Sequence, residues 1–98
     1  MSGSVEPFPI SGALAFLLRT GKDSLTTRQL SVIMACRDST QTERGLASEL
    51  GVSKPAITRA ADRLTEEGLL HRELDMNDRR SVNLVLSAAG RKFAANFV

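Results

Sequence analysis

The stretch that decides the fold is Gly51-Val52-Ser53-Lys54-Pro55, which ends one helix and begins the next. Glycine favours the left-handed conformation that follows a helix, so Gly51 predicts a C-cap. Ser53 predicts an N-cap, and Pro55 fits the first turn of a helix, where a missing N–H costs little. Only Val52, an apolar anchor, lies between the two caps. Two helices joined by so tight a turn are predicted to form a helix-turn-helix.

Apolar periodicity gives the lengths of the two helices in this motif. The first is predicted over Thr42–Leu50, and the second over Lys54–Glu67 with Gly68 as its C-cap. On the second helix, at about 100° per residue, four apolar residues share one side and are predicted to face the core. These are Ile57, Ala60, Ala61 and Leu64.

A β-hairpin is predicted after the second helix. Leu69–Leu74 is extended in pattern, Asp75–Arg80 is a polar turn, and Val82–Leu86 alternates apolar and polar residues in the manner of a strand with one buried face. Ser87 predicts the N-cap of a final helix. The predicted fold class is therefore mainly α with a small β-hairpin wing (α+β), that is, a winged helix-turn-helix.

Two further helices are predicted upstream of the motif. The first, Ile10–Arg19, is apolar on almost every side. The second begins after Thr26, which forms a capping-box pattern with Gln29, and runs to about Arg37. A polar connection, Asp38–Gln41, leads from this helix to the helix-turn-helix.

The chain of 98 residues fits one domain. We expect a flexible N-terminus over residues 1–9 and a single winged-helix DNA-binding domain over residues 10–98, with the helix-turn-helix at 42–67 and the wing at 69–86. One cysteine and one histidine leave little for a metal site or proton transfer, so no cofactor, no metal and no enzyme activity are expected. The net charge of +2 is compatible with a polyanionic partner but does not demand one.

The longest apolar stretch, Phe8–Leu18, is interrupted by Pro9, Ser11 and Gly12. It is shorter than the roughly 20 residues that cross a bilayer. The sequence therefore predicts a cytoplasmic protein without a membrane partner.

The outward face of the second motif helix has a polarity along its length. Opposite the core side lie Pro55, Thr58, Arg59, Asp62 and Glu66, with Lys54 and Arg63 at the flanks. The N-terminal half of this face is hydroxylated and basic, which suits a recognition helix that enters the major groove by its N-terminal end. A helix face with charges of both signs is, in isolation, usually only solvated.

These residues divide into two predicted kinds of contact. Ser53, Thr58 and Arg59 are placed to reach phosphates or base edges, whereas Lys54 and Arg63 suit the DNA backbone. Two roles are open for Asp62: it accepts from a cytosine amino group, or it holds Arg59 or Arg63 in place.

The hairpin tip carries Arg79 and Arg80, which cannot face a core from that position. A long cationic side chain at a hairpin tip can enter a minor groove. Asp78 beside them is expected to orient these arginines.

The residues around the motif resemble those of a known family. Ser53-Lys54-Pro55-Ala56-Ile57-Thr58-Arg59, Asp62-Arg63-Leu64 and Glu67-Gly68-Leu69 are similar to the recognition helix of MarR-family bacterial transcription regulators. The wing residues Asp78-x-Arg80-x-x-x-Leu84-x-Leu86-Ser87-x-x-Gly90 are similar to the family signature D-x-R-x-x-x-[LV]-x-L-T-x-x-G, with Ser87 in place of threonine. The resemblance covers about Leu25 to Lys92.

The resemblance implies a double-stranded DNA-binding regulator, often a repressor, that binds a pseudo-palindromic operator as a homodimer. It implies that Arg80, helped by Arg79, enters the minor groove and that Asp78 supports the wing. The implied contacts of the recognition helix are Ser53, Lys54, Pro55, Thr58, Arg59 and Arg63.

Family members dimerise through long terminal helices, and their effector pocket lies between these helices and the DNA-binding lobe. The last predicted helix stops at Val98, so a small-molecule effector is doubtful for this chain. We expect the two apolar ends of the chain to meet in a two-fold interface; the alternative is that both pack on the chain's own core. The residues concerned are Leu14, Phe16, Leu17, Leu18, Phe93 and Phe97.

The single cysteine and the single histidine are each expected to have a structural role. Cys36 is expected to be a small buried hydrophobe, with a peroxide-sensing thiol as the alternative that the resemblance allows. His71 is expected to be structural or adjacent to phosphate. A protein–protein docking module without DNA binding is the alternative function, and the basic residues Lys54, Arg59, Arg79 and Arg80 argue against it, since docking does not need them.

Overall fold

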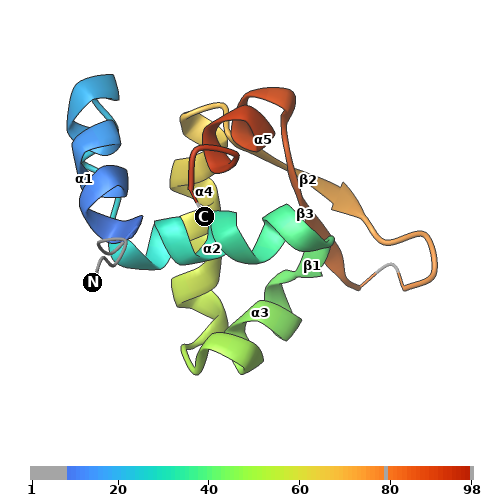
Figure 1. Ribbon diagram of the computed structural model, residues 1–98. Coiled ribbons are helices and arrows are strands. Elements are labelled where there is room, and N and C mark those ends of the chain that lie inside the picture. The colour runs from blue at the N-terminus through green and yellow to red at the C-terminus, as the bar shows by residue number, and fades with distance from the viewer. Residues whose placement is uncertain (1–8, 79, 98) are drawn as a thin grey trace, which may run out of the picture.

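The computed structural model describes residues 9–78 and 80–97, and the side chains of residues 11–78 and 80–97. Within these residues, five helices and three strands follow one another (Figure 1). Their bounds are α1 (Pro9–Thr20), α2 (Thr27–Asp38), β1 (Gln41–Thr42), α3 (Glu43–Leu50), α4 (Lys54–Glu66), β2 (Leu70–Leu74), β3 (Val82–Leu86) and α5 (Ala88–Ala94).

The predicted helix caps are confirmed except at the end of α4, where Glu67 is the C-cap and Gly68, predicted as the cap, follows it with φ at 75°. At α2 both halves of the capping box form, because the Gln29 N–H donates to Thr26 Oγ1 at 3.0 Å and the Thr26 N–H donates to Gln29 Oε1 at 2.8 Å. Ser53 and Ser87 cap α4 and α5 through their hydroxyl oxygens. Gly51 ends α3 with φ at 71°, the left-handed conformation that glycine adopts without steric cost. The tight turn between α3 and α4 is thus built by local interactions.

The three strands form one antiparallel sheet in the order β1-β3-β2. The predicted hairpin is confirmed, with Leu70 opposite Leu86 and Arg72 opposite Leu84. Strand β1 was not predicted: Asp38–Gln41 was expected to be a polar connection and Thr42 to begin the next helix. Its two residues pair with β3, Gln41 opposite Leu84, and so short a polar edge strand has no apolar alternation of its own to reveal it.

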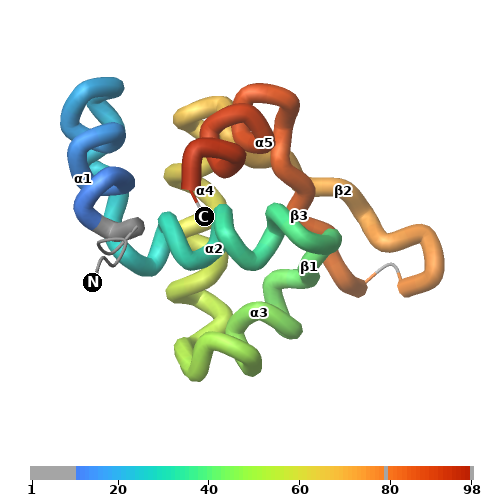
Figure 2. The backbone as a smooth tube through the Cα atoms, viewed as in Figure 1, coloured from blue at the N-terminus to red at the C-terminus, as the bar shows by residue number. Residues whose placement is uncertain are grey.

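The core lies where α2, α3 and α4 meet the sheet. In Figure 1, α2 crosses the centre with α4 behind it, α3 lies below and α5 above. The backbone tube shows the β2–β3 hairpin projecting to one side, away from the helices (Figure 2). The largest fully buried side chains come from α2, α3, α4 and β3: Val32, Ile33, Leu46, Ile57, Leu64 and Leu84. All four residues predicted to form the core side of α4 are buried.

The two apolar ends of the chain meet within one molecule. The Phe16 ring lies 5.7 Å from the rings of Phe93 and Phe97, centroid to centroid, and Leu17 and Phe93 are buried in the core. The alternative left open by the sequence, packing on the chain's own core, therefore holds for these residues.

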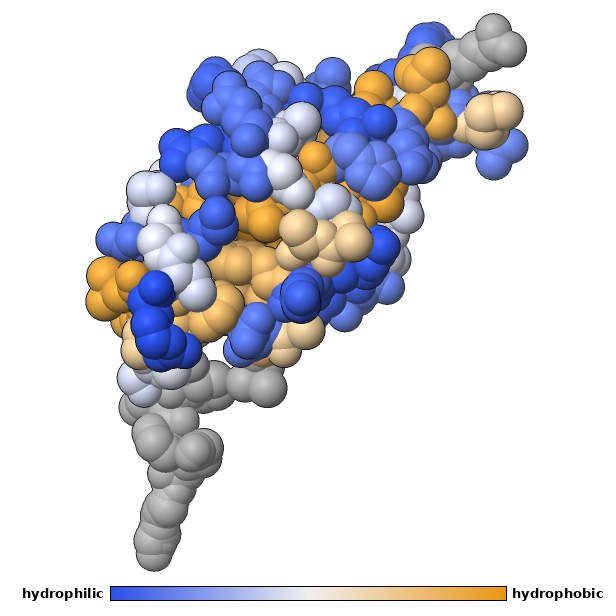
Figure 3. Space-filling model, turned by 90° about the horizontal axis from the view of Figure 1, so that it is seen from above, coloured by the Kyte–Doolittle hydropathy of each residue, from blue (hydrophilic) through white to orange (hydrophobic). Residues whose placement is uncertain are grey.

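Other apolar side chains of α1 remain at the surface. Leu14 and Leu18 keep 54% and 68% of their surface exposed. Seen from above, apolar side chains come to the surface between polar ones (Figure 3). Among the described residues, no helix is long and apolar enough to cross a membrane.

Candidate nucleic-acid interface

The N-terminal half of α4 presents the predicted contact residues to solvent. Ser53, Lys54, Pro55 and Arg59 are exposed, and Thr58 is half-buried. Lys54, Pro55, Thr58 and Arg59 together line an open, shallow hollow on the outer face of the helix. The Ser53 hydroxyl oxygen already accepts the Ala56 N–H at 3.2 Å, so this residue caps the helix and remains exposed.

The wing tip is organised by Asp78. Its Oδ1 atom accepts the backbone N–H of Arg80 at 3.0 Å, and its Oδ2 atom accepts the Ser81 hydroxyl at 3.2 Å. The Arg80 side chain is 91% exposed and its Nε lies 3.8 Å from Asp78 Oδ1. Arg79 lies outside the described residues. The carboxylate thus holds the turn while the Arg80 side chain extends into solvent.

The wing and the helix-turn-helix meet around a second hollow, and basic residues from three elements converge there. It has a volume of about 20 Å³ and is lined in part by Arg44 of α3, Lys54 of α4 and Arg80 of the wing. Neighbouring cations raise the local positive potential and attract polyanions. Glu43 also lines this hollow, but its carboxylate is bound to Arg72.

The sequence analysis did not single out Arg44. The available signal was its place in the first turn of the predicted Thr42–Leu50 helix, off the face that carries Leu46 and Ala47.

A polar network behind the hollow joins α3, α4 and β2. Arg72 of β2 donates through Nε to Glu43 Oε2 at 2.8 Å and through Nη2 to the Thr58 carbonyl at 3.1 Å. Its Nη2 also pairs with Asp62 Oδ1 at 2.8 Å. The Thr58 hydroxyl donates to Glu43 Oε1 at 3.0 Å. One guanidinium therefore links the wing strand to both helices of the motif.

This network corrects one of the two roles considered for Asp62, that of holding Arg59 or Arg63 in place; acceptance from a cytosine amino group stays a prediction. Its carboxylate pairs with Arg72 rather than with Arg59 or Arg63. The reason is tertiary, because β2 passes beside α4 and brings Arg72 to Asp62. The pairing also neutralises Asp62, one of the two carboxylates on the outer face of α4; the other, Glu66, is exposed.

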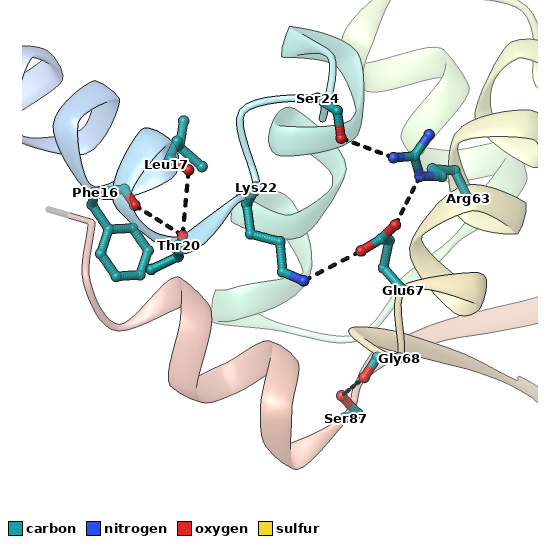
Figure 4. Close-up of polar contacts among 9 residues, drawn as sticks. All are labelled: Phe16, Leu17, Thr20, Lys22, Ser24, Arg63, Glu67, Gly68 and Ser87. Carbon is teal, nitrogen blue, oxygen red and sulfur yellow. Dashed lines mark hydrogen bonds and ion pairs between the residues drawn. The ribbon is translucent and has the colours of Figure 1, made fainter.

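Arg63 is engaged at the other end of the molecule (Figure 4). Its Nε lies 3.2 Å from Glu67 Oε2, and its Nη2 donates to Ser24 Oγ at 3.0 Å. Lys22 binds the other oxygen of Glu67 at 3.3 Å, and this hydrogen bond lowers the pKa of the Glu67 carboxyl. The predicted contact of Arg63 with a DNA phosphate would have to use the guanidinium donors that these partners leave free, or replace the partners.

Cys36 and His71, the only cysteine and the only histidine of the sequence, show no sign of a catalytic or metal site among the described residues. Cys36 is buried, and burial raises the pKa of its thiol to about 11, which favours the buried-hydrophobe interpretation over a reactive thiolate. His71 is exposed on the wing, with Nε2 at 2.9 Å from Glu73 Oε2. The part of the chain that the structure describes holds no group of three or more histidine, cysteine or acidic residues that could bind a metal.

Five helices with a three-stranded wing define a winged helix-turn-helix protein, which confirms the predicted fold class. The model of the MarR family matches residues 25–82, and the chain belongs to this family. The transcriptional regulator AdcR of Streptococcus pneumoniae serotype 2 (strain D39 / NCTC 7466) is 32% identical over 75 residues, which are 76% of this chain and 51% of AdcR. The chain thus spans about half the length of this curated relative.

Two solved structures share the fold. The transcriptional regulator BldR from Sulfolobus solfataricus superimposes with a TM-score of 0.71 and 30% identity, over 88% of this chain and 63% of BldR. FabT of Streptococcus pneumoniae, solved in complex with DNA, has a TM-score of 0.76 and 21% identity, over 88% of this chain and 60% of FabT. The relatives AdcR and BldR are transcriptional regulators rather than enzymes.

Proposed function

We propose that this chain is a sequence-specific, double-stranded DNA-binding transcriptional regulator that acts as a repressor. The single observation that carries the proposal is the convergence of Arg44, Lys54 and Arg80 on one hollow beside the exposed N-terminal half of α4. Membership of the MarR family supports the same function. A bound regulator would repress by keeping the transcription machinery off the DNA that it covers.

In the proposed complex, α4 enters the major groove by its N-terminal end. The helix N-terminus carries partial positive charge and unpaired N–H groups, which favour a phosphate there. Lys54 and Arg44 bind the backbone, while Arg59 reaches base edges. The wing tip, residues 75–80, lies along the minor groove, where the extended Arg80 side chain inserts.

The proposed partner assembly is a homodimer on a pseudo-palindromic operator. Leu14, Leu17, Leu30, Met34 and Phe97 line an apolar groove between α1, α2 and the end of the chain. An exposed apolar groove of this kind is stabilised when a second protein surface covers it. Nothing in the described residues favours a small-molecule effector, and none is proposed.

The test is the fluorescence anisotropy of labelled genomic-fragment and random duplexes, titrated with the protein at about 50 to 200 mM salt. We expect a steep salt dependence and at least one fragment bound far more tightly than random duplex. Arg80→Ala is expected to weaken this binding by about tenfold, since one arginine contact with DNA contributes roughly 1–3 kcal/mol.

Lys92→Ala is the matched control, because it removes the same charge from the exposed surface of α5, beside Phe16 and Glu67 rather than beside the wing. Both variants should keep the unfolding temperature of the natural chain. Equal binding by the two variants would contradict the role of the wing. Absence of binding to every duplex would favour the docking-module alternative.

Transcription from a template that carries the bound fragment should fall when the protein is added; a rise would contradict the repressor role.

A further inference from the structure

Thr58 stands between the outer face of α4 and the network behind it. It is the fifth residue of the helix and lines the open hollow with Lys54 and Arg59. Its hydroxyl also donates to Glu43 Oε1 at 3.0 Å. The Thr58 hydroxyl is therefore hydrogen-bonded to an acceptor inside the protein, while the Thr58 side chain borders the surface that DNA would meet.

The direction of this hydrogen bond follows from the partner. A carboxylate accepts and does not donate, and Glu43 is paired with Arg72 through its other oxygen at 2.8 Å. Glu43 is only 7% exposed, so Oε1 cannot turn to bulk water for another donor. A threonine hydroxyl has one hydrogen and two lone pairs. Its hydrogen is thus committed to Glu43, and only its lone pairs are free.

We infer that Thr58 reads DNA as a hydrogen-bond acceptor, so that it selects a base with an amino group in the major groove. The amino groups presented there are N6 of adenine and N4 of cytosine, whereas guanine and thymine present the oxygens O6 and O4. The inference rests on the proposed DNA-binding function and names a determinant of its specificity.

A contact of the opposite polarity would break the network. To donate to a phosphate, to guanine O6 or to thymine O4, the hydroxyl would withdraw its hydrogen from Glu43 and leave a buried carboxylate oxygen unpaired. Unpaired buried polar atoms are expensive compared with the gain from one surface hydrogen bond. Lys54 is exposed beside Thr58 and supplies donors for phosphates without this cost.

The sharpest variant is Glu43→Gln. Its amide oxygen accepts from Arg72 Nε, which places the amide nitrogen at the position of Oε1, facing Thr58. The nitrogen then donates to the hydroxyl oxygen and frees the hydroxyl hydrogen to point outward. This variant should reverse the preference from an amino base to a keto base at one position. Thr58→Ser should keep the natural preference, and Thr58→Val should abolish it.

The measurement is selection of bound duplexes from a random library with each protein, followed by anisotropy titration of the best duplex and its single-base variants. For the natural chain we expect about a two- to tenfold preference for adenine or cytosine over guanine or thymine at one position. Glu49→Gln is the matched control, because it removes one negative charge from an exposed residue of α3 and should change no base preference. Thr58→Val leaves Glu43 Oε1 without its hydrogen-bond donor, although Oε2 stays paired with Arg72, so the binding of this variant is measured below its own unfolding temperature.

The outcomes separate this inference from the proposed function. An amino-base preference that is kept in Thr58→Ser, lost in Thr58→Val and reversed in Glu43→Gln supports it. A selected motif that Thr58→Val or Glu43→Gln leaves unaltered at every position overturns the inference alone. If the natural chain selects no motif, the proposed sequence-specific function fails together with the role of Thr58.

Discussion

Gly90 allows α5 to lie directly against the chain that leaves α4. A Cβ atom at this position would lie 1.9 Å from the carbonyl oxygen of Leu69. That oxygen accepts the Ser87 N–H at 3.1 Å, so it cannot move away without losing this hydrogen bond. The last glycine of the wing signature therefore has a packing role, which explains why no larger residue fits there.

Gly90→Ala is expected to destabilise the protein by about 2–3 kcal/mol, since overpacking of a rigid backbone contact has costs of this order. The measurement is urea unfolding followed by circular dichroism. Gly12→Ala is the control: no atom lies within 4 Å of a Cβ there, and alanine stabilises a helix interior by up to about 1 kcal/mol over glycine. Equal stability of the two variants would show that α5 can shift away from Leu69.

Three elements of the interface are held together by Arg72, which connects β2 to α3 and α4. Its guanidinium is the basic partner of the buried Glu43 and the exposed Asp62. The angle between recognition helix and wing is therefore fixed by one side chain rather than by apolar packing alone. Arg72 is a positioning residue, since its guanidinium is bound within this network rather than presented on the outer face of α4.

Arg72→Met keeps an unbranched apolar stem and removes the charged guanidinium group. We expect the free energy of unfolding to fall by about 3 kcal/mol, because the buried Glu43 carboxylate is left without its cationic partner. Adding Glu43→Gln to this variant should recover part of the loss, since the unpaired charge is then gone. Urea unfolding of the two single variants and the double variant measures both effects. Arg28→Met, at an exposed residue of α2, should stay within about 0.5 kcal/mol of the natural chain. A double variant no more stable than Arg72→Met would contradict the ion-pair argument.

At the scale of the whole molecule, the exposed apolar side chains of α1 are expected to lie in the interface of the proposed dimer. Leu14 borders the apolar groove and Leu18 is exposed on the same helix. We expect sedimentation equilibrium to give the mass of two chains. We also expect operator half-sites about 10 base pairs apart, centre to centre. Leu14→Lys with Leu18→Lys should shift the mass to one chain without unfolding it, since charges in a buried interface are strongly unfavourable.

Met76→Lys is the control for this experiment, because Met76 is also an exposed apolar residue but lies on the wing, with 91% of its surface exposed. It should leave the dimer mass unchanged. The natural chain would contradict the proposal if it had the mass of one chain at every concentration and protected a single half-site.

Much of this architecture follows from interactions between residues close in sequence. Ser53 and Ser87 bond to N–H groups three residues ahead, and β3 buries Leu84 and Leu86 on either side of the half-buried Val85. The exposed positions of Lys54 and Arg59 follow from helical periodicity in the same way. Such features depend on the local chain alone, and the sequence predicted them correctly.

Contacts between distant residues are a different matter. Arg72 meets Glu43 across 29 positions, and Arg63 meets Ser24 across 39. No pattern in the sequence shows which of several carboxylates or hydroxyls a given arginine will choose. The packing of Phe16 against Phe93 was likewise one of two alternatives until both ends of the chain were placed. Hydrophobicity acts without direction, so it indicates that a side chain is buried but not against what. The partner of a charge and the neighbour of an apolar face are set only when the helices and strands take their positions in space.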